Sequence, residues 1–102
     1  MKEREFRLWM EKTNHDYHTA RTYAARCYRI EAGMNIDLDE EYKKDQGASL
    51  IQSLKYSRAE ANNKLLPRCG ITFDDDANVY TGMSAIRVSV KKYFEFIKQS
   101  ES

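Results

Sequence analysis

The C-terminal quarter of the sequence carries the pattern that most restricts the fold. Apolar side chains recur there every three or four residues over about five helical turns. They are Val79, Met83, Ile86, Val90, Tyr93, Phe94 and Ile97. A helix that is apolar along one whole face must bury that face against other elements. The pattern therefore predicts a long final helix in the core of a helical domain.

A second long helix is predicted for the stretch "NHDYHTARTYAARCYRIEAG", Asn14–Gly33. Asn14 or Asp16 can cap its N-terminus, and Gly33 stands where a helix commonly stops. Its buried stripe, in steps of three and four, is Ala20, Tyr23, Ala24, Cys27 and Ile30. At 100° per residue, Arg21, Arg26 and Arg29 fall within an arc of about 140° away from that stripe. These arginines must be solvated or partnered.

Shorter helices are predicted for the rest of the chain. The first begins near Glu3, ends near Thr13 and is anchored by its aromatic residues, including Trp9. Another spans about Asp39–Lys43, with Asp37 and Glu40 spaced as a capping box and with Leu38 and Tyr42 docking it. Two more follow in "GASLIQSLKYSRAEANNKLLP". One covers Leu50, Ile51 and Leu54, and one opens with the box Ser57 to Glu60 and closes before Pro67.

Residues 67–80 form the one long loop of this scheme, with room for a small hairpin of 71–73 against 78–80. The prediction is an all-α fold: one domain, residues 1–102, with about four to six helices of which the second and last are long. A chain of 102 residues, 41% of them hydrophobic, is large enough for one buried core. Its two cysteines, Cys27 and Cys69, are expected to be reduced structural thiols.

Charge is distributed unevenly although the net charge is only +1. Residues 1–33 carry seven basic and five acidic residues, residues 34–80 carry six and nine, and residues 81–102 carry four and two. Both ends are therefore basic and the middle is acidic. On the last helix Arg87, Lys91 and Lys98 lie along one flank of the apolar face, and Lys92 is expected to point away. If the terminal helices lie side by side, their basic flanks form one positive surface.

Several functions are excluded by what the sequence lacks. The N-terminus alternates charged and apolar residues, unlike a signal peptide, and no apolar run approaches the roughly 20 residues of a membrane span. A cytoplasmic location is expected. No phosphate-binding glycine loop or nucleophile elbow occurs, so we expect no enzyme, no cofactor and no small-molecule ligand. His15 and His18 lack further ligands for a metal, and "DLDEEYKKD" lacks the glycine and final glutamate of a calcium loop.

The order of five segments resembles a known family. They are "FRLWMEK", "TARTYAARCYRIE", "DLDEEYKKD", "LIQSLKYSRAEANN" and "VYTGMSAIRVSVKKYFEFI". Together they resemble the small N-terminal helical domain of phage-integrase-type tyrosine recombinases, called core-binding or SAM-like, and related helical modules that precede bacterial endonuclease domains. The residues that carry the likeness are Thr19, Tyr23, Ala85, Tyr93 and Phe96.

The resemblance implies a DNA-clamping module without chemistry, because in recombinases the catalytic residues sit in a separate C-terminal domain. The family places basic and hydroxyl side chains of its longer helices against phosphates. In this sequence those positions are Thr19, Arg21, Thr22, Arg26, Arg29, Arg87 and Lys91. The acidic middle and the long loop 71–80 depart from the family pattern.

Two alternatives stay open. One is a small protein-interaction module, such as a phage-encoded inhibitor of a nucleic-acid-processing nuclease complex, whose acidic surface imitates a phosphate run. Its contacts would be Asp37, Asp39, Glu40, Glu41, Asp74, Asp75 and Asp76. The other is an oligomerising domain with Tyr17, Tyr28 and Phe96 as exposed aromatic contacts.

Overall fold

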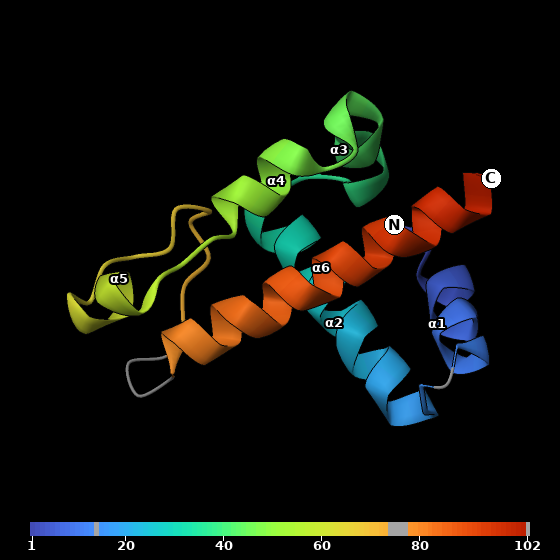
Figure 1. Ribbon diagram of the computed structural model, residues 1–102, viewed down its shortest axis with the longest axis horizontal. Helices are drawn as coiled ribbons and strands as arrows, with labels where there is room; N and C mark the ends of the chain where they lie inside the picture. The colour runs from blue at the N-terminus through green and yellow to red at the C-terminus, as the bar shows by residue number, and fades with distance from the viewer. Residues whose placement is uncertain (14, 74–77, 102) are drawn as a thin grey trace.

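Two long helices cross at the centre of the molecule. In the computed structural model, which describes residues 1–13, 15–73 and 78–101, α6 (Val79–Glu101) passes in front of α2 (Tyr17–Met34) (Figure 1). Small side chains line the crossing: Ala24 of α2 is buried, and the Cys27 thiol donates to the Ser89 carbonyl of α6 at 3.4 Å. Their small size lets the two helices approach closely. The predicted apolar stripes of both helices are confirmed as the core, except that Tyr23 and Val79 are only half-buried.

Helix α1 (Glu3–Lys12) packs across both long helices, and its contacts with α6 are aromatic. The Phe6 ring meets Tyr93 edge-on with centroids 5.2 Å apart, and Trp9 lies 5.7 Å from Phe96. Such pairs add to the free energy gained by burying their area. Lys92 does not point away as expected, because its ammonium lies 5.8 Å from the Trp9 ring centroid, half-buried beside α1.

A side-chain hydrogen bond caps the N-terminus of α2, and a residue in the left-handed conformation ends the helix. Its N-cap is Asp16, whose carboxylate accepts from the Thr19 backbone N–H at 2.7 Å, whereas Asn14 lies outside the described residues. The expected stop at Gly33 is wrong. The helix runs to Met34 and ends at Asn35, which adopts the left-handed conformation with φ 55°. Gly33 serves packing instead, since a Cβ there would lie 2.3 Å from Ile71 Cδ1.

Three short helices follow in the chain: α3 (Leu38–Asp45), α4 (Ala48–Ser53) and α5 (Arg58–Asn62). Asp37 caps α3 by accepting from the Asp39 N–H at 2.9 Å, but Glu40 pairs with Lys43 at 3.5 Å instead of closing the predicted box. The capping box of Ser57 and Glu60 on α5 is confirmed.

The predicted hairpin is wrong. The described residues contain no strand, and Val79 and Tyr80 form the first turn of α6. The Asn78 side chain accepts from the Thr81 N–H at 3.0 Å, which is helix-capping geometry, so the chain enters a helix at this point. The all-α prediction with long second and last helices is confirmed.

Candidate nucleic-acid interface

One face of α2 is largely exposed in the part of the fold that the structure describes. We call it the α2 outer face, and its exposed residues are Tyr17, His18, Arg21, Thr22, Ala25, Tyr28, Arg29 and Ala32. It points away from α6, because the opposite side of the helix makes the crossing (Figure 1). No acidic residue occurs on α2 from position 17 to position 30. The outer face is therefore a surface of arginines, tyrosines and small residues.

The three arginines of α2 lie over aromatic rings. Arg21 lies over Tyr17 with its guanidinium carbon 5.5 Å from the ring centroid, and Arg26 lies over Tyr23 at 5.9 Å. Arg29 lies over Phe73 at 4.5 Å, and its Nη2 also donates to the Thr72 carbonyl at 2.7 Å. Within the described part of the chain, none of the three is within 4.0 Å of a carboxylate. The rings restrain the side chains while their charges stay available.

The two threonines predicted to contact phosphate differ from the arginines. The Thr22 hydroxyl is exposed but donates to the His18 carbonyl at 2.9 Å, within the helix. Thr19 is half-buried near the N-terminal end of α2, next to its Asp16 cap. These hydroxyls are therefore weaker phosphate donors than the arginines.

Two hollows shape the outer face. One, of about 290 Å³, is lined by His18, Arg21, Thr22 and Ala25. The other, of about 600 Å³, lies where α2 meets residues 70–72, and its α2 wall includes Tyr28 and Arg29. Small residues at the floor let a ligand backbone come close to the helix.

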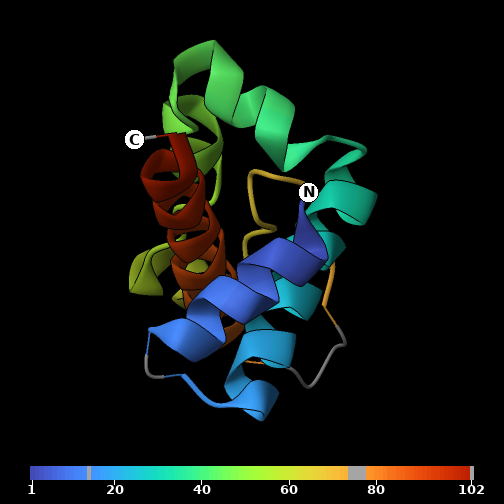
Figure 2. The same ribbon diagram turned by 90° about the vertical axis from the view of Figure 1, so that its right-hand side faces the viewer.

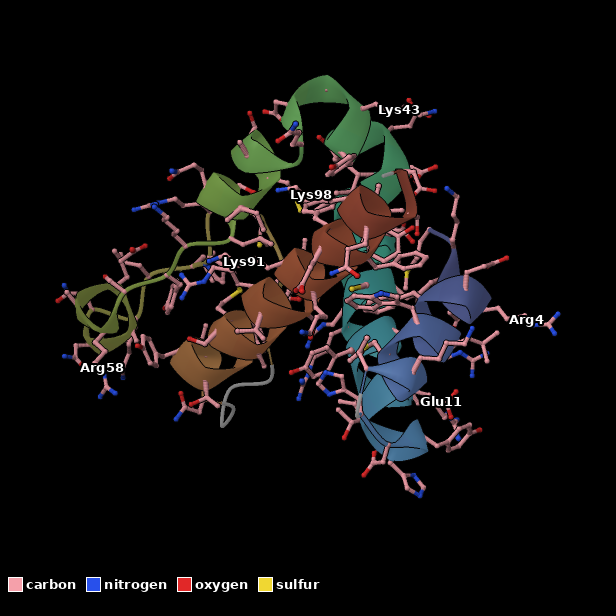
Figure 3. All side chains as sticks on the ribbon, turned by 45° about the vertical axis from the view of Figure 1, so that its right-hand side comes forward. Arg4, Glu11, Lys43, Arg58, Lys91 and Lys98 are labelled. Carbon is pink, nitrogen blue, oxygen red and sulfur yellow. The ribbon has the colours of Figure 1, made fainter. Side chains whose placement is uncertain are left out.

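Arg87 and Lys91 are on α6 and are not part of the α2 outer face. Arg87 lines a groove of about 310 Å³ together with Lys55, Tyr56, Ser57, Glu60 and Arg68. Lys91 follows one turn later, and Figure 3 shows it on the side of α6 nearer to the α4–α5 connection. Ser89 faces α2, and at 100° per residue the positions two before and two after it point to the opposite side of α6.

The expectation of one shared basic surface is therefore wrong. Viewed along the long axis, α6 and α2 lie on opposite sides of the molecule, with α1 across both (Figure 2). The basic residues of α2 and the pair Arg87 and Lys91 consequently face in opposite directions.

The acidic segment is largely engaged in internal contacts. The Met1 ammonium lies 3.2 Å from Glu31, 3.4 Å from Asp37 and 4.0 Å from Asp39, an arrangement we call the N-terminal cage. Asp39 also accepts from the Tyr93 hydroxyl. Burial raises the pKa of Asp37, but the hydrogen bond from the Asp39 N–H and the nearby ammonium lower it on balance.

The neighbouring glutamates are paired within α3. Glu40 lies 3.5 Å from Lys43, and Glu41 lies 3.6 Å from Lys44. Asp74, Asp75 and Asp76 lie outside the described residues. The four described acids of the alternative site thus each have a cation in contact.

Of the three aromatic residues expected to be exposed in an oligomerising domain, two are exposed. Tyr17 and Tyr28 are 51% and 66% exposed, but Phe96 is only 5% exposed. It packs between Phe6 and Trp9, because it lies three residues after the buried Tyr93 and so on the same face of α6. The prediction that Phe96 is exposed is therefore wrong.

The side chains that could bind a metal or react as nucleophiles do not form a cluster among the described residues. The described residues contain no group of three or more His, Cys, Asp and Glu arranged for a metal ion. Cys27 and Cys69 are both free thiols, as predicted, and burial raises the pKa of Cys27 to about 12, with a smaller contribution from Glu31. None of the described helices combines the length and apolar character needed to cross a membrane.

Sequence reasoning missed two parts of this picture. Glu31 belongs to the N-terminal cage, and Lys55 and Arg68 join Arg87 in the groove. Each contact joins segments far apart in the chain, and no local spacing predicts it.

Comparison of the chain with models of protein families, with curated proteins and with solved structures found no match.

Proposed function

We propose that this chain is a non-catalytic DNA-binding module that contacts the phosphate backbone through the α2 outer face. The observation that carries the proposal is an 18-residue helix whose exposed outer face carries Arg21 and Arg29 and which has no acidic residue over positions 17–30. Phosphates are neutralised by such cations, and the released counterions drive binding. The resemblance to the core-binding domain of tyrosine recombinases agrees with this role, which would be exercised in the cytoplasm.

The arginines suit backbone contact rather than base reading. Arg21 and Arg29 are eight residues apart, about 12 Å along the helix axis. Their guanidinium groups rest on rings at both ends of the face, and planar guanidinium forks match phosphate oxygens well. Between them lie the small residues Thr22 and Ala25, over which a DNA strand can pass closely.

The acidic alternative has less support. A nucleic-acid mimic needs carboxylates that are free to meet a basic channel, and the described acids of that segment already contact cations. Reversal of Glu40 and Glu41 to lysine tests it, since capture of a basic partner should then be lost.

The DNA-binding proposal is tested by replacing Arg21 and Arg29 together with alanine. Binding of a fluorescent duplex, followed by anisotropy over a range of salt concentrations, should weaken for all sequences tested. The slope of log affinity against log salt should fall by about two units, since each lost phosphate contact removes about 0.9.

The matched control removes two exposed charges from other helices, Lys43→Ala with Arg58→Ala. Arg58 also lies over a ring, that of Tyr80, at 4.9 Å. This variant should keep nearly the original slope. Unchanged affinity of the Arg21 and Arg29 variant at low salt, or an equal loss in the control, would contradict the proposal.

A further inference from the structure

A second cationic surface lies on the side of the molecule opposite to the α2 outer face. We call it the α6 groove. Its hollow is lined by the basic residues Lys55, Arg68 and Arg87, and Lys91, one turn after Arg87 on α6, lies beside it (Figure 3). They come from three segments: the turn after α4, the loop after α5, and α6 itself. Figure 3 shows Lys91 and, further along α6, Lys98 on the side that faces α4 and the α4–α5 connection.

Positive charge dominates this groove. The one acidic residue in its lining is Glu60, whose carboxylate contacts Arg68 at 3.3 Å and accepts from the Ser57 N–H. Lys55, Arg87 and Lys91 have no carboxylate within 4.0 Å among the described residues. Glu95, one turn after Lys91, pairs with Lys92 instead, at 3.5 Å. Lys55 and Arg87 in the groove, and Lys91 beside it, therefore keep positive charges that no described carboxylate neutralises.

The chemistry of the groove fits a run of phosphates. Arg87 and Lys91 are one helical turn apart, about 6 Å along the axis, and Lys98 follows about 10 Å further on. A row of this kind can follow a charged polymer backbone. The groove lining includes none of the large exposed apolar side chains of the molecule, whereas protein interfaces have an apolar centre. Nucleic acid is thus a better occupant than an acidic protein.

We propose that the chain binds two nucleic-acid segments at once, one on the α2 outer face and one in the α6 groove, and so bridges them. The inference rests on the proposed function for its first surface. The two surfaces share no residue and face in opposite directions across the shortest dimension of the molecule, 20 Å between Cα extremes (Figure 2). Two duplexes can therefore be held without overlapping.

The experiment is a two-duplex capture. A biotinylated duplex on beads is saturated with protein and washed, and retention of a second, fluorescent duplex is measured at low salt. The wild-type chain should retain the second duplex. The variant Arg87→Glu with Lys91→Glu should still bind the immobilised duplex with an affinity within about threefold, but its retention of the second duplex should fall at least tenfold.

Two controls make the result specific. The variant Lys43→Glu with Lys44→Glu makes the same charge change on α3, away from both surfaces, and should retain the second duplex. Sedimentation of the DNA-free protein should show a monomer, because a dimer with one binding surface per chain also bridges. Circular dichroism of each variant shows whether it is folded.

Each other outcome has a definite meaning. Binding of the immobilised duplex without retention of the second overturns the bridging inference and leaves the proposed function standing. No binding of any duplex overturns both. Bridging that survives the Arg87 and Lys91 reversal also overturns the inference. Occupation of the groove by polyglutamate, with no retention of a second duplex, would assign it to an acidic protein instead.

Discussion

At the scale of single residues, the N-terminal cage is the densest set of charges in the described structure. Burial opposes the charge of the Met1 ammonium, but the hydrogen bond and charge of Glu31, together with Asp39 and Asp37, outweigh it and raise the pKa of the amine above 8.0. Glu31 is 15% exposed and also accepts from the Leu38 N–H at 2.9 Å. One carboxylate thus connects the start of the chain, α2 and the start of α3.

The cage predicts a pH-dependent effect of Glu31→Gln in the chain with a free amine at Met1. The amide can still accept from Leu38 but no longer balances the ammonium, so the free energy of unfolding at pH 7 should fall by about 1.5–3 kcal/mol. A raised pKa means that the ammonium contributes fully below about pH 8 and is lost as the pH rises through the raised value. The difference in the free energy of unfolding between the wild type and Glu31→Gln should therefore become smaller above pH 8.

Urea unfolding at several pH values between 7 and 10 measures this difference. The control is Glu40→Gln, because Glu40 forms only an exposed pair with Lys43 and should change stability by less than about 0.5 kcal/mol at every pH. If Glu31→Gln lowers the free energy of unfolding by the same amount at every pH, the Met1 ammonium does not contribute to the stabilising effect of Glu31.

At the scale of elements, the junction of α3 and α4 is fixed from two sides. The Asp45 carboxylate accepts from the Gly47 and Ser49 N–H groups at 3.1 and 3.0 Å. Gly47 itself has φ 81°, and a Cβ there would lie 2.2 Å from Phe94 Cε2 of α6. The glycine thus allows both a left-handed turn and close packing on the last helix.

Gly47→Ala should lower the free energy of unfolding by about 2–4 kcal/mol, because it combines left-handed strain with a collision against the buried Phe94 ring. Gly70→Ala is the matched control, with the same φ of 81° but no atom within 4 Å of its Cβ. That change should cost about 1–2 kcal/mol. Equal losses in thermal or urea unfolding would mean that the ring relaxes without cost.

The position of a helix could be predicted from the sequence where residues close together in the chain determine it. The periodicity of α6 and the caps at Asp16, Asp37 and Ser57 depend on neighbours within four residues. The prediction that the helix stops at Gly33 failed because a glycine can either end a helix or make room for a distant side chain. Here it makes room for Ile71, which is 38 residues away in the sequence. The hairpin failed because Asn78 acts as a helix cap, which the alternation of apolar residues around it does not reveal.

At the scale of the whole molecule, one core connects α1, α2, α3 and α6. Phe6 and Met10 of α1, Ile30 of α2, Leu38 of α3 and Val90 of α6 are all fully buried in it. The sequence correctly predicted most of the buried side chains, although Phe96 was expected to be exposed and Tyr23 to be buried. It could not predict that the basic flanks face apart, because that depends on which arc of α6 meets α2.

A single core predicts cooperative unfolding. Trp9 packs between Phe6, Phe96 and Lys92, so its fluorescence reports whether α1 is docked, while circular dichroism reports total helix content. Both signals should give the same urea midpoint. Phe6→Leu should move both midpoints together to lower urea. A separate early fluorescence transition would show instead that α1 undocks before the long helices unfold.

The crossing of α2 and α6 through small side chains has a consequence for how such a chain can diversify. Because the two outward sides of the crossing share no side chain, selection can alter the charge on one while the other drifts or is conserved. Ala24, Cys27 and Ser89 do not have that freedom, since enlarging any of them would push the helices apart. The two outward sides can therefore change independently of each other, whereas the buried residues between them must stay small.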